Sequence, residues 1–162
     1  MITPEVARSM EESVLCWLAT VSETGVPNVS PKEAFLHDGQ GRILVANIAS
    51  PVTVKNIEAV EQVCISFVNV FVQKGYKIQG RARVYRSGET GFEERHGKLT
   101  EKIGTRFPIL SVIEIEPKSI AEIIAPSYRL YPESREEDRI RESWEAYQVE
   151  KYERQTNERD QA

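Results

Sequence analysis

The sequence predicts a mainly β protein of the α+β class, built as a small antiparallel barrel of about six strands with short helices and a C-terminal helix. Short runs rich in β-branched and aromatic residues recur between residues 14 and 124, and turn-forming residues separate them. The predicted strands do not alternate regularly with long helices, which argues against a parallel dinucleotide-binding sheet. These observations favour a closed or partly open antiparallel barrel.

The first third of the chain is expected to form one helix and a three-stranded meander. Thr3 before Pro4 is typical of a helix start, with a hydroxyl N-cap and proline at the first helical position, so we expect a helix over residues 4–12. The next apolar run ends at Glu23, Thr24 and Gly25, which indicates a hairpin turn. The expected strands are residues 14–21, 27–36 and 42–47.

The remainder should complete the barrel and add a C-terminal extension. Ser50 and Pro51 begin a second short helix, and Gly75 and Gly80 suggest bulges or close backbone approaches in a long strand. Residues 1–126 are expected to form one domain, and residues 127–162 an extension that is not a separate domain. We expect helices over 51–59, 89–102 and 135–155, strands over 63–70, 73–86 and 109–124 (bent at Pro117), an irregular segment over 125–134 and a frayed terminus.

Composition narrows the classes of partner and location. The 162 residues carry a formal net charge of −4, which lacks the basic face that nucleic-acid binding requires. The longest apolar stretches are too short to span a bilayer, and the N-terminus is acidic where a secretory signal is basic, so we expect a cytoplasmic protein. Cys16 and Cys64 lie in apolar runs and indicate buried free thiols, with no metal site.

One constellation of residues could bind a ligand, although the standard catalytic motifs are absent from the sequence. The strand segment 30–36 is expected to run antiparallel to 43–47, and a helix starts directly afterwards at Ser50. A helix N-terminus suits a phosphate because it offers unpaired N–H groups and the positive end of the dipole. Thr53, Lys55 and Asn56 add polar groups there. Alternatively, Ser50 is an ordinary N-cap and Lys55 a surface charge.

The run LATVSETGVPNVSP at residues 18–31 resembles the opening hairpin of the pyridoxamine-phosphate-oxidase-like FMN-binding proteins. The resemblance continues through Asp38-Gly39, the strand to Asn47, the following helix and Gly80-Arg81-Ala82. It covers residues 10–86 well and 109–124 loosely. It implies a six-stranded split β-barrel that forms a homodimer, with FMN bound at the subunit interface.

The resemblance also implies a role for particular residues. One strand segment would line the isoalloxazine ring and the ribityl chain, the end of the next strand would meet the ribityl phosphate, and the helix start would hold the phosphate. A further contact would reach the flavin from the other side. In that order, the implied residues are Ser30, Pro31, Lys32 and Glu33; Ala46 and Asn47; Ser50, Thr53 and Asn56; and Gln73 or Lys74.

Two departures from the family pattern bear on the reaction. This chain has Val52-Thr53 where true pyridoxamine phosphate oxidases carry an Arg-Lys pair, and it contains no Arg-x-His segment to grip that substrate. The expected function is therefore that of an FMN-dependent oxidoreductase on another, unidentified small substrate. The alternatives are an electron carrier or FMN-storage protein, and a flavin-free ligand-binding barrel. No residue stands out as a catalytic acid or base. Trp144 and Tyr147 could pack on their own barrel, across the dimer or over the flavin as a lid, and ordinary packing is expected rather than a role in the site.

Overall fold

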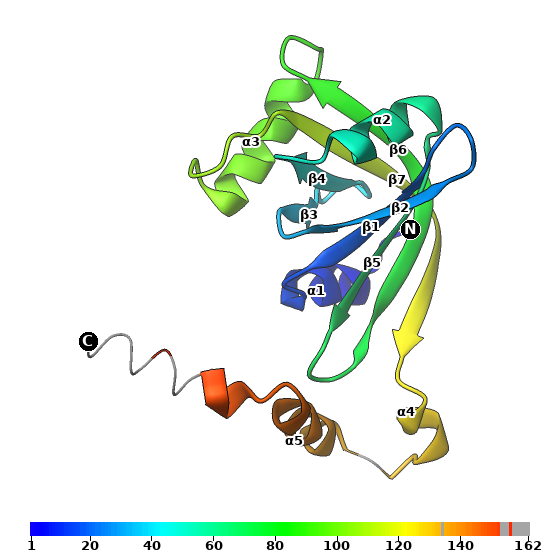
Figure 1. The fold of residues 1–162 in the computed structure, drawn as a ribbon, viewed down its shortest axis with the longest axis vertical. Helices are drawn as coiled ribbons and strands as arrows, with labels where there is room; N and C mark the ends of the chain where they lie inside the picture. Colours follow the sequence, from blue (N-terminus) through cyan, green and yellow to red (C-terminus); the bar gives the residue numbers. More distant parts are fainter. Residues whose placement is uncertain (134, 153–155, 157–162) are drawn as a thin grey trace.

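The computed structural model describes residues 1–133, 135–152 and 156, and its centre is one antiparallel sheet of seven strands (Figure 1). The order of the strands is β2-β1-β5-β6-β7-β4-β3. The predicted α+β class is confirmed, and the count exceeds the expected six because one expected strand is divided in two. The strands are β1 (Cys16–Val21), β2 (Pro27–Lys32), β3 (Phe35–His37), β4 (Ile43–Asn47), β5 (Gln62–Asn69), β6 (Lys74–Arg86) and β7 (Ser111–Ile124).

The division falls at residues 33 and 34 and changes the expected topology. β2 pairs with β1, placing Lys32 opposite Cys16, whereas β3 pairs with β4 at the other end of the sheet. The predicted three-stranded meander is therefore wrong, because only the second part of the segment 27–36 pairs with β4. Two residues span from one edge of the sheet to the other, so the sheet must curl. The Ala46 N–H bonds to the Ala34 carbonyl at 2.9 Å, and the arrangement is that of a split barrel.

Two glycines permit the tight packing of the long strands, as the sequence predicted. The register of β6 and β7 shifts between Gln79 and Gly80, opposite Pro117, so the bulge lies where the proline removes a ladder N–H. A Cβ atom at Gly80 would lie 2.4 Å from the Glu116 carbonyl oxygen, and one at Gly75 would lie 2.0 Å from the Phe67 carbonyl oxygen. Both positions therefore require glycine because no side chain fits there.

Three helices cover the curled sheet at the positions that the sequence predicted: α1 (Pro4–Glu12), α2 (Pro51–Ala59) and α3 (Phe92–Ile103). The Thr3 hydroxyl accepts a hydrogen bond from the Val6 N–H at 3.3 Å, which confirms it as the N-cap of α1. α1 and α2 bury their apolar sides in the main core inside the barrel, whereas α3 packs on a second apolar cluster around β4. Figure 1 shows α3 at the β3–β4 end of the molecule.

The C-terminal extension contains α4 (Ser127–Leu130) and α5 (Glu136–Ala146), which contact the turn between β5 and β6. The Tyr128 hydroxyl donates to the Val72 carbonyl at 2.8 Å, and the Ser143 hydroxyl donates to the Phe71 carbonyl at 3.0 Å. In Figure 1 these helices lie at the opposite end of the molecule from α3. Side-chain hydroxyls thus attach the extension to the tip of one hairpin.

The expected continuous helix over residues 135–155 is interrupted. α5 ends at Ala146, and Gln148 has a positive φ of 53°, which an α-helix does not accommodate. Helical backbone resumes at residues 149–152, while the expected helix end and the frayed terminus lie outside the described residues. Trp144 and Tyr147 pack against the Phe71 ring with centroids 6.4 and 6.3 Å away, as predicted. Within the described part of the chain, no helix has the length and apolarity needed to cross a membrane.

Candidate functional site

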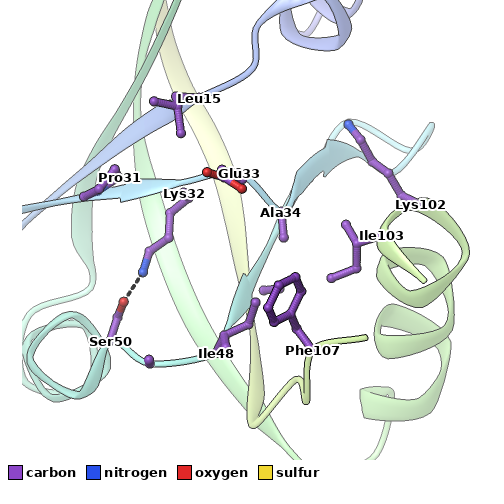
Figure 2. Close-up of a pocket in the computed structure, with 12 residues that line it drawn as sticks. Leu15, Pro31, Lys32, Glu33, Ala34, Ile48, Ser50, Lys102, Ile103 and Phe107 are labelled. Atoms are coloured by element: carbon purple, nitrogen blue, oxygen red, sulfur yellow. Dashed lines mark hydrogen bonds between the residues drawn. The ribbon is translucent and has the colours of Figure 1, made fainter. Parts of the chain in front are cut away.

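A pocket of about 640 Å³ lies where β2 passes into β3, between the start of α2 and the end of α3 (Figure 2). Its size falls within the range of about 300–1,000 Å³ that is usual for small-molecule sites. The lining side chains divide into a polar end near α2 and an apolar end near α3. They are Leu15, Pro31, Lys32, Glu33, Ala34, Ala46, Ile48, Ala49, Ser50, Lys102, Ile103 and Phe107.

Lys32 and Ser50 form the polar end. The Lys32 ammonium donates a hydrogen bond to the Ser50 hydroxyl, as the dashed line in Figure 2 marks. The Ser50 N–H in turn bonds to the Asn47 side-chain oxygen at 3.0 Å. Ser50 occupies the N-cap position of α2 as predicted, but its side chain makes no capping bond to the helix and accepts from Lys32 instead. The first-turn N–H groups of α2 have no intrahelical partner, which makes this end of the pocket suitable for an anion.

The charge at this end is unusual because it is buried. Lys32 is 7% exposed, and its only hydrogen-bond partner within the described residues is Ser50, with no carboxylate in salt-bridge range. Burial lowers the pKa of the Lys32 ammonium. Burial also raises the pKa of the neighbouring Cys16 thiol to about 12, so Cys16 is neutral and supplies no counter-charge. A buried cation normally has an anionic partner, and Lys32 has none among the described residues. An anionic ligand in the pocket could supply this partner.

The apolar end is formed by residues that the sequence did not single out. Ile103 continues the buried stripe of α3 one turn beyond Leu99, a helical spacing that could have identified it. Phe107 belongs to the loop after α3 and had no such signal. Lys102 also lines the pocket, but its ammonium donates to the Phe35 carbonyl at 2.7 Å and so attaches α3 to the edge strand β3.

The residues predicted to hold the phosphate are Ser50, Thr53 and Asn56. Of these, Ser50 lines the pocket, whereas Thr53 and Asn56 do not. Thr53, which is 1% exposed, donates through its hydroxyl to the Ser30 hydroxyl at 3.3 Å. Asn56 is also buried and donates through its amide to the Thr20 hydroxyl at 3.1 Å. Both side chains of α2 therefore connect this helix to the β1–β2 hairpin. Helical spacing explains this, since both lie on the buried face of α2.

Gln73 and Lys74, which were predicted to contact the flavin, do not line the pocket and bind other residues. The Gln73 amide donates to the Ser143 hydroxyl at 3.3 Å, and the Lys74 ammonium contacts the Glu136 carboxylate at 2.5 Å. Both partners belong to the C-terminal extension. Among the described residues, no group of His, Cys, Asp or Glu is arranged to hold a metal ion. From the predicted set, the structure thus brings together at the pocket Pro31, Lys32, Glu33, Ala46 and Ser50, with Asn47 adjoining them.

The fold is a curled antiparallel sheet like that of a split barrel, with a pocket of the size usual for small molecules, and comparison with known proteins identifies the family. The family described as pyridoxamine 5'-phosphate oxidase matches residues 2–124, so the chain belongs to that family. A curated relative, the uncharacterized protein MJ0282 of Methanocaldococcus jannaschii, is 32% identical over 90 residues. That match covers 54% of this chain and 59% of the relative's length.

Solved structures share the fold. HupZ of Group A Streptococcus matches with a TM-score of 0.63 and 26% identity over 74% of this chain and 92% of its own. An FMN-binding protein from Syntrophomonas wolfei matches with a TM-score of 0.62 and 15% identity over 75% of this chain and 86% of its own. HutZ, the heme storage protein of Vibrio cholerae, matches with a TM-score of 0.57 and 20% identity over 76% of this chain and 94% of its own.

Proposed function

We propose that this protein binds FMN, with the phosphate at the polar end of the pocket. The observation that carries the proposal is the buried Lys32 ammonium, which is directed at Ser50 beside the N-terminus of α2 and has no counter-ion among the described residues. An FMN phosphate would supply that counter-ion and accept hydrogen bonds from the helix N–H groups. Membership of the family and the fold shared with an FMN-binding protein support the choice of flavin.

Lys32 takes a different role in this proposal from the one that the resemblance implied. The resemblance placed Lys32 along the isoalloxazine ring, but its side chain extends to the start of α2. There it supplies the positive charge that Val52-Thr53 lacks in comparison with an Arg-Lys pair. Ser50 orients the ammonium, and the Asn47 side-chain oxygen holds Ser50 in place by accepting a hydrogen bond from the Ser50 N–H. Pro31 and Glu33 remain the candidates to contact the ring system and the ribityl chain.

We propose further that the protein is an oxidoreductase acting on a small substrate other than pyridoxamine phosphate. A bound flavin itself supplies hydride or electron transfer, and the protein positions it and excludes water. The lining side chains suit that division of labour, because apolar groups dominate the pocket and its buried ammonium is at the polar end. The absence of an Arg-x-His segment from the sequence removes the element that would grip pyridoxamine phosphate.

The proposed active form is a cytoplasmic homodimer with FMN at the subunit interface. The outer face of the β1–β2 hairpin supports it, because Trp17 is 48% exposed and Val29 is 58% exposed. Trp17 lies opposite Pro31, which also lines the pocket. An exposed apolar surface that is continuous with a ligand pocket is typical of an interface, and a second copy of the chain would cover it.

The test of cofactor binding is direct. The purified protein, washed free of flavin and titrated with FMN, should quench FMN fluorescence and gain thermal stability, and riboflavin should bind more weakly because it lacks the phosphate. If the protein shows neither quenching nor stabilisation, the proposal is contradicted, and the alternative of a flavin-free ligand-binding barrel remains. Reduction of bound FMN by NADH or NADPH, followed by reoxidation by an added acceptor, would distinguish an oxidoreductase from a storage protein.

A further inference from the structure

An FMN phosphate at Lys32 and Ser50 would occupy the polar end of the pocket, and the apolar end has no proposed ligand group so far. Figure 2 shows the Phe107 ring beside Ile48 and Ile103, across the pocket from the Lys32–Ser50 pair. Phe107 is 50% exposed although it adjoins an apolar cavity. A half-exposed aromatic ring in such a position offers a surface on which another flat ring can stack.

The charges around this end are directed away from the cavity or lie outside it. The Lys102 ammonium bonds to the Phe35 carbonyl and lies 5.4 Å from the centre of the Phe35 ring. The Arg106 guanidinium lies over the Phe107 ring, 5.4 Å from its centre, and does not line the pocket. The other side chains at this end are small or aliphatic. A ligand here therefore meets mainly apolar atoms and one aromatic ring. Besides Lys102, the charged residues that line the pocket are Lys32, at the polar end, and Glu33, between Lys32 and Ala34.

We propose that Ile103 and Phe107 form the substrate subsite and select a flat, uncharged, conjugated ring. This inference rests on the proposed function, since it places the substrate at the apolar end while the FMN phosphate occupies the polar end. Stacking on Phe107 would hold the substrate ring, and Ile48 and Ile103 would contact its edges. Because α3 and the following loop supply this wall, they determine which substrate the barrel accepts.

Two matched probes test the charge and the shape together. Coumarin is flat and uncharged, and coumarin-3-carboxylate carries the same ring system with one negative charge. We expect calorimetric titration of the FMN-loaded protein to show coumarin binding, and the carboxylate to bind at least about fivefold more weakly. Phe107→Ala should weaken coumarin binding by about five- to tenfold, and Phe107→Tyr should restore it. Leu110→Ala is the control, since Leu110 is an exposed apolar residue of the same segment that does not line the pocket.

The outcomes separate the subsite from the proposed function. If Phe107→Ala weakens FMN as much as coumarin, the wall holds the flavin ring and the substrate subsite is refuted. If coumarin-3-carboxylate binds more tightly than coumarin, Lys102 or Arg106 recognises an anion and the uncharged class is wrong. If FMN does not bind the wild-type protein but coumarin binds in a Phe107-dependent way, the FMN proposal fails and the apolar subsite stands. A lack of coumarin binding to a protein that does hold FMN overturns the subsite alone.

Discussion

Replacing Lys32 by methionine isolates the contribution of the buried ammonium. Methionine has a similar length and flexibility, so it can fill the same space beside Cys16 and Ser50 without a charge. In the ligand-free protein the ammonium is almost fully buried and bonds only to the Ser50 hydroxyl among the described residues. Removing it ends a desolvation cost and loses one hydrogen bond. Buried ionic groups replaced by apolar ones are often neutral or stabilising by about 1–4 kcal/mol, so the free energy of unfolding should stay constant or rise.

The effect on FMN should have the opposite sign. A hydrogen bond to a charged group contributes about 1.5–3 kcal/mol, so Lys32→Met should raise the Kd for FMN by roughly 10- to 150-fold. Riboflavin should bind the variant and the wild type alike, because it has no phosphate to lose a partner. Lys55→Met is the matched control, since Lys55 is an exposed lysine of α2 and its loss changes the net charge equally.

Fluorescence titration with FMN and riboflavin, combined with urea unfolding of the ligand-free proteins, measures both quantities. The reasoning is refuted if Lys32→Met weakens FMN and riboflavin equally, because the ammonium would then contact the ring or serve only the fold. It is refuted as well if Lys55→Met costs as much FMN affinity as Lys32→Met, since long-range charge alone would explain the loss. A variant that unfolds far more easily without ligand would show that the lysine stabilises the empty pocket.

Three further predictions concern pH, α2 and the outer face. Because burial lowers the pKa of Lys32 in the folded state, the unfolded chain binds more protons at pH values between that pKa and the ordinary lysine value. In this range the free energy of unfolding should rise with pH, while the affinity for FMN should fall. Titrations from about pH 7 to about pH 10 should show neither trend in Lys32→Met. Asn56→Ala breaks the bond to Thr20 and should cost about 1–3 kcal/mol in urea unfolding, with FMN affinity changed less than about twofold; a tenfold loss in a folded variant would mean that Asn56 reaches the phosphate. Trp17→Glu should convert the proposed dimer to a monomer in sedimentation experiments. Val70→Glu, at the exposed turn between β5 and β6, should leave the dimer intact. A wild-type monomer that binds FMN tightly would exclude the interfacial site.

The sequence predicted α1, α2, α3 and most strands because their signals are local, whereas α4 forms within the segment 125–134 that was expected to be irregular. Thr3-Pro4 and Ser50-Pro51 mark helix starts, and the apolar alternation of β6 survives over most of its length. The break between β2 and β3 was missed because it depends on which strands pair, and pairing is decided by tertiary packing. In the structure Ala34 and Phe35 are both buried in succession, so the strand alternation loses its phase at the crossing.

The site was predicted in part for a comparable reason. Residue type and position after a helix start selected Ser50, Thr53 and Asn56 alike, but only Ser50 lies on the pocket side. Helical phase would have separated them. The wall from Phe107 could not be predicted, because a loop residue has no periodicity and reaches the pocket only through the packing of α3. The contacts of Gln73 with the C-terminal extension likewise depend on a long-range meeting of segments.

The short crossing from β2 to β3 also bears on how the protein avoids aggregation. An open sheet leaves two edge strands with unpaired backbone groups, which can template pairing with other chains. Here both edge strands, β2 with six residues and β3 with three, belong to one bent segment whose bend lines the pocket. The Ala34 carbonyl is satisfied by the Ala46 N–H, and the Phe35 carbonyl by the Lys102 ammonium. The bend that forms the pocket therefore also leaves these two backbone carbonyls with partners, and Lys102 supplies one of them from a position where it lines the pocket.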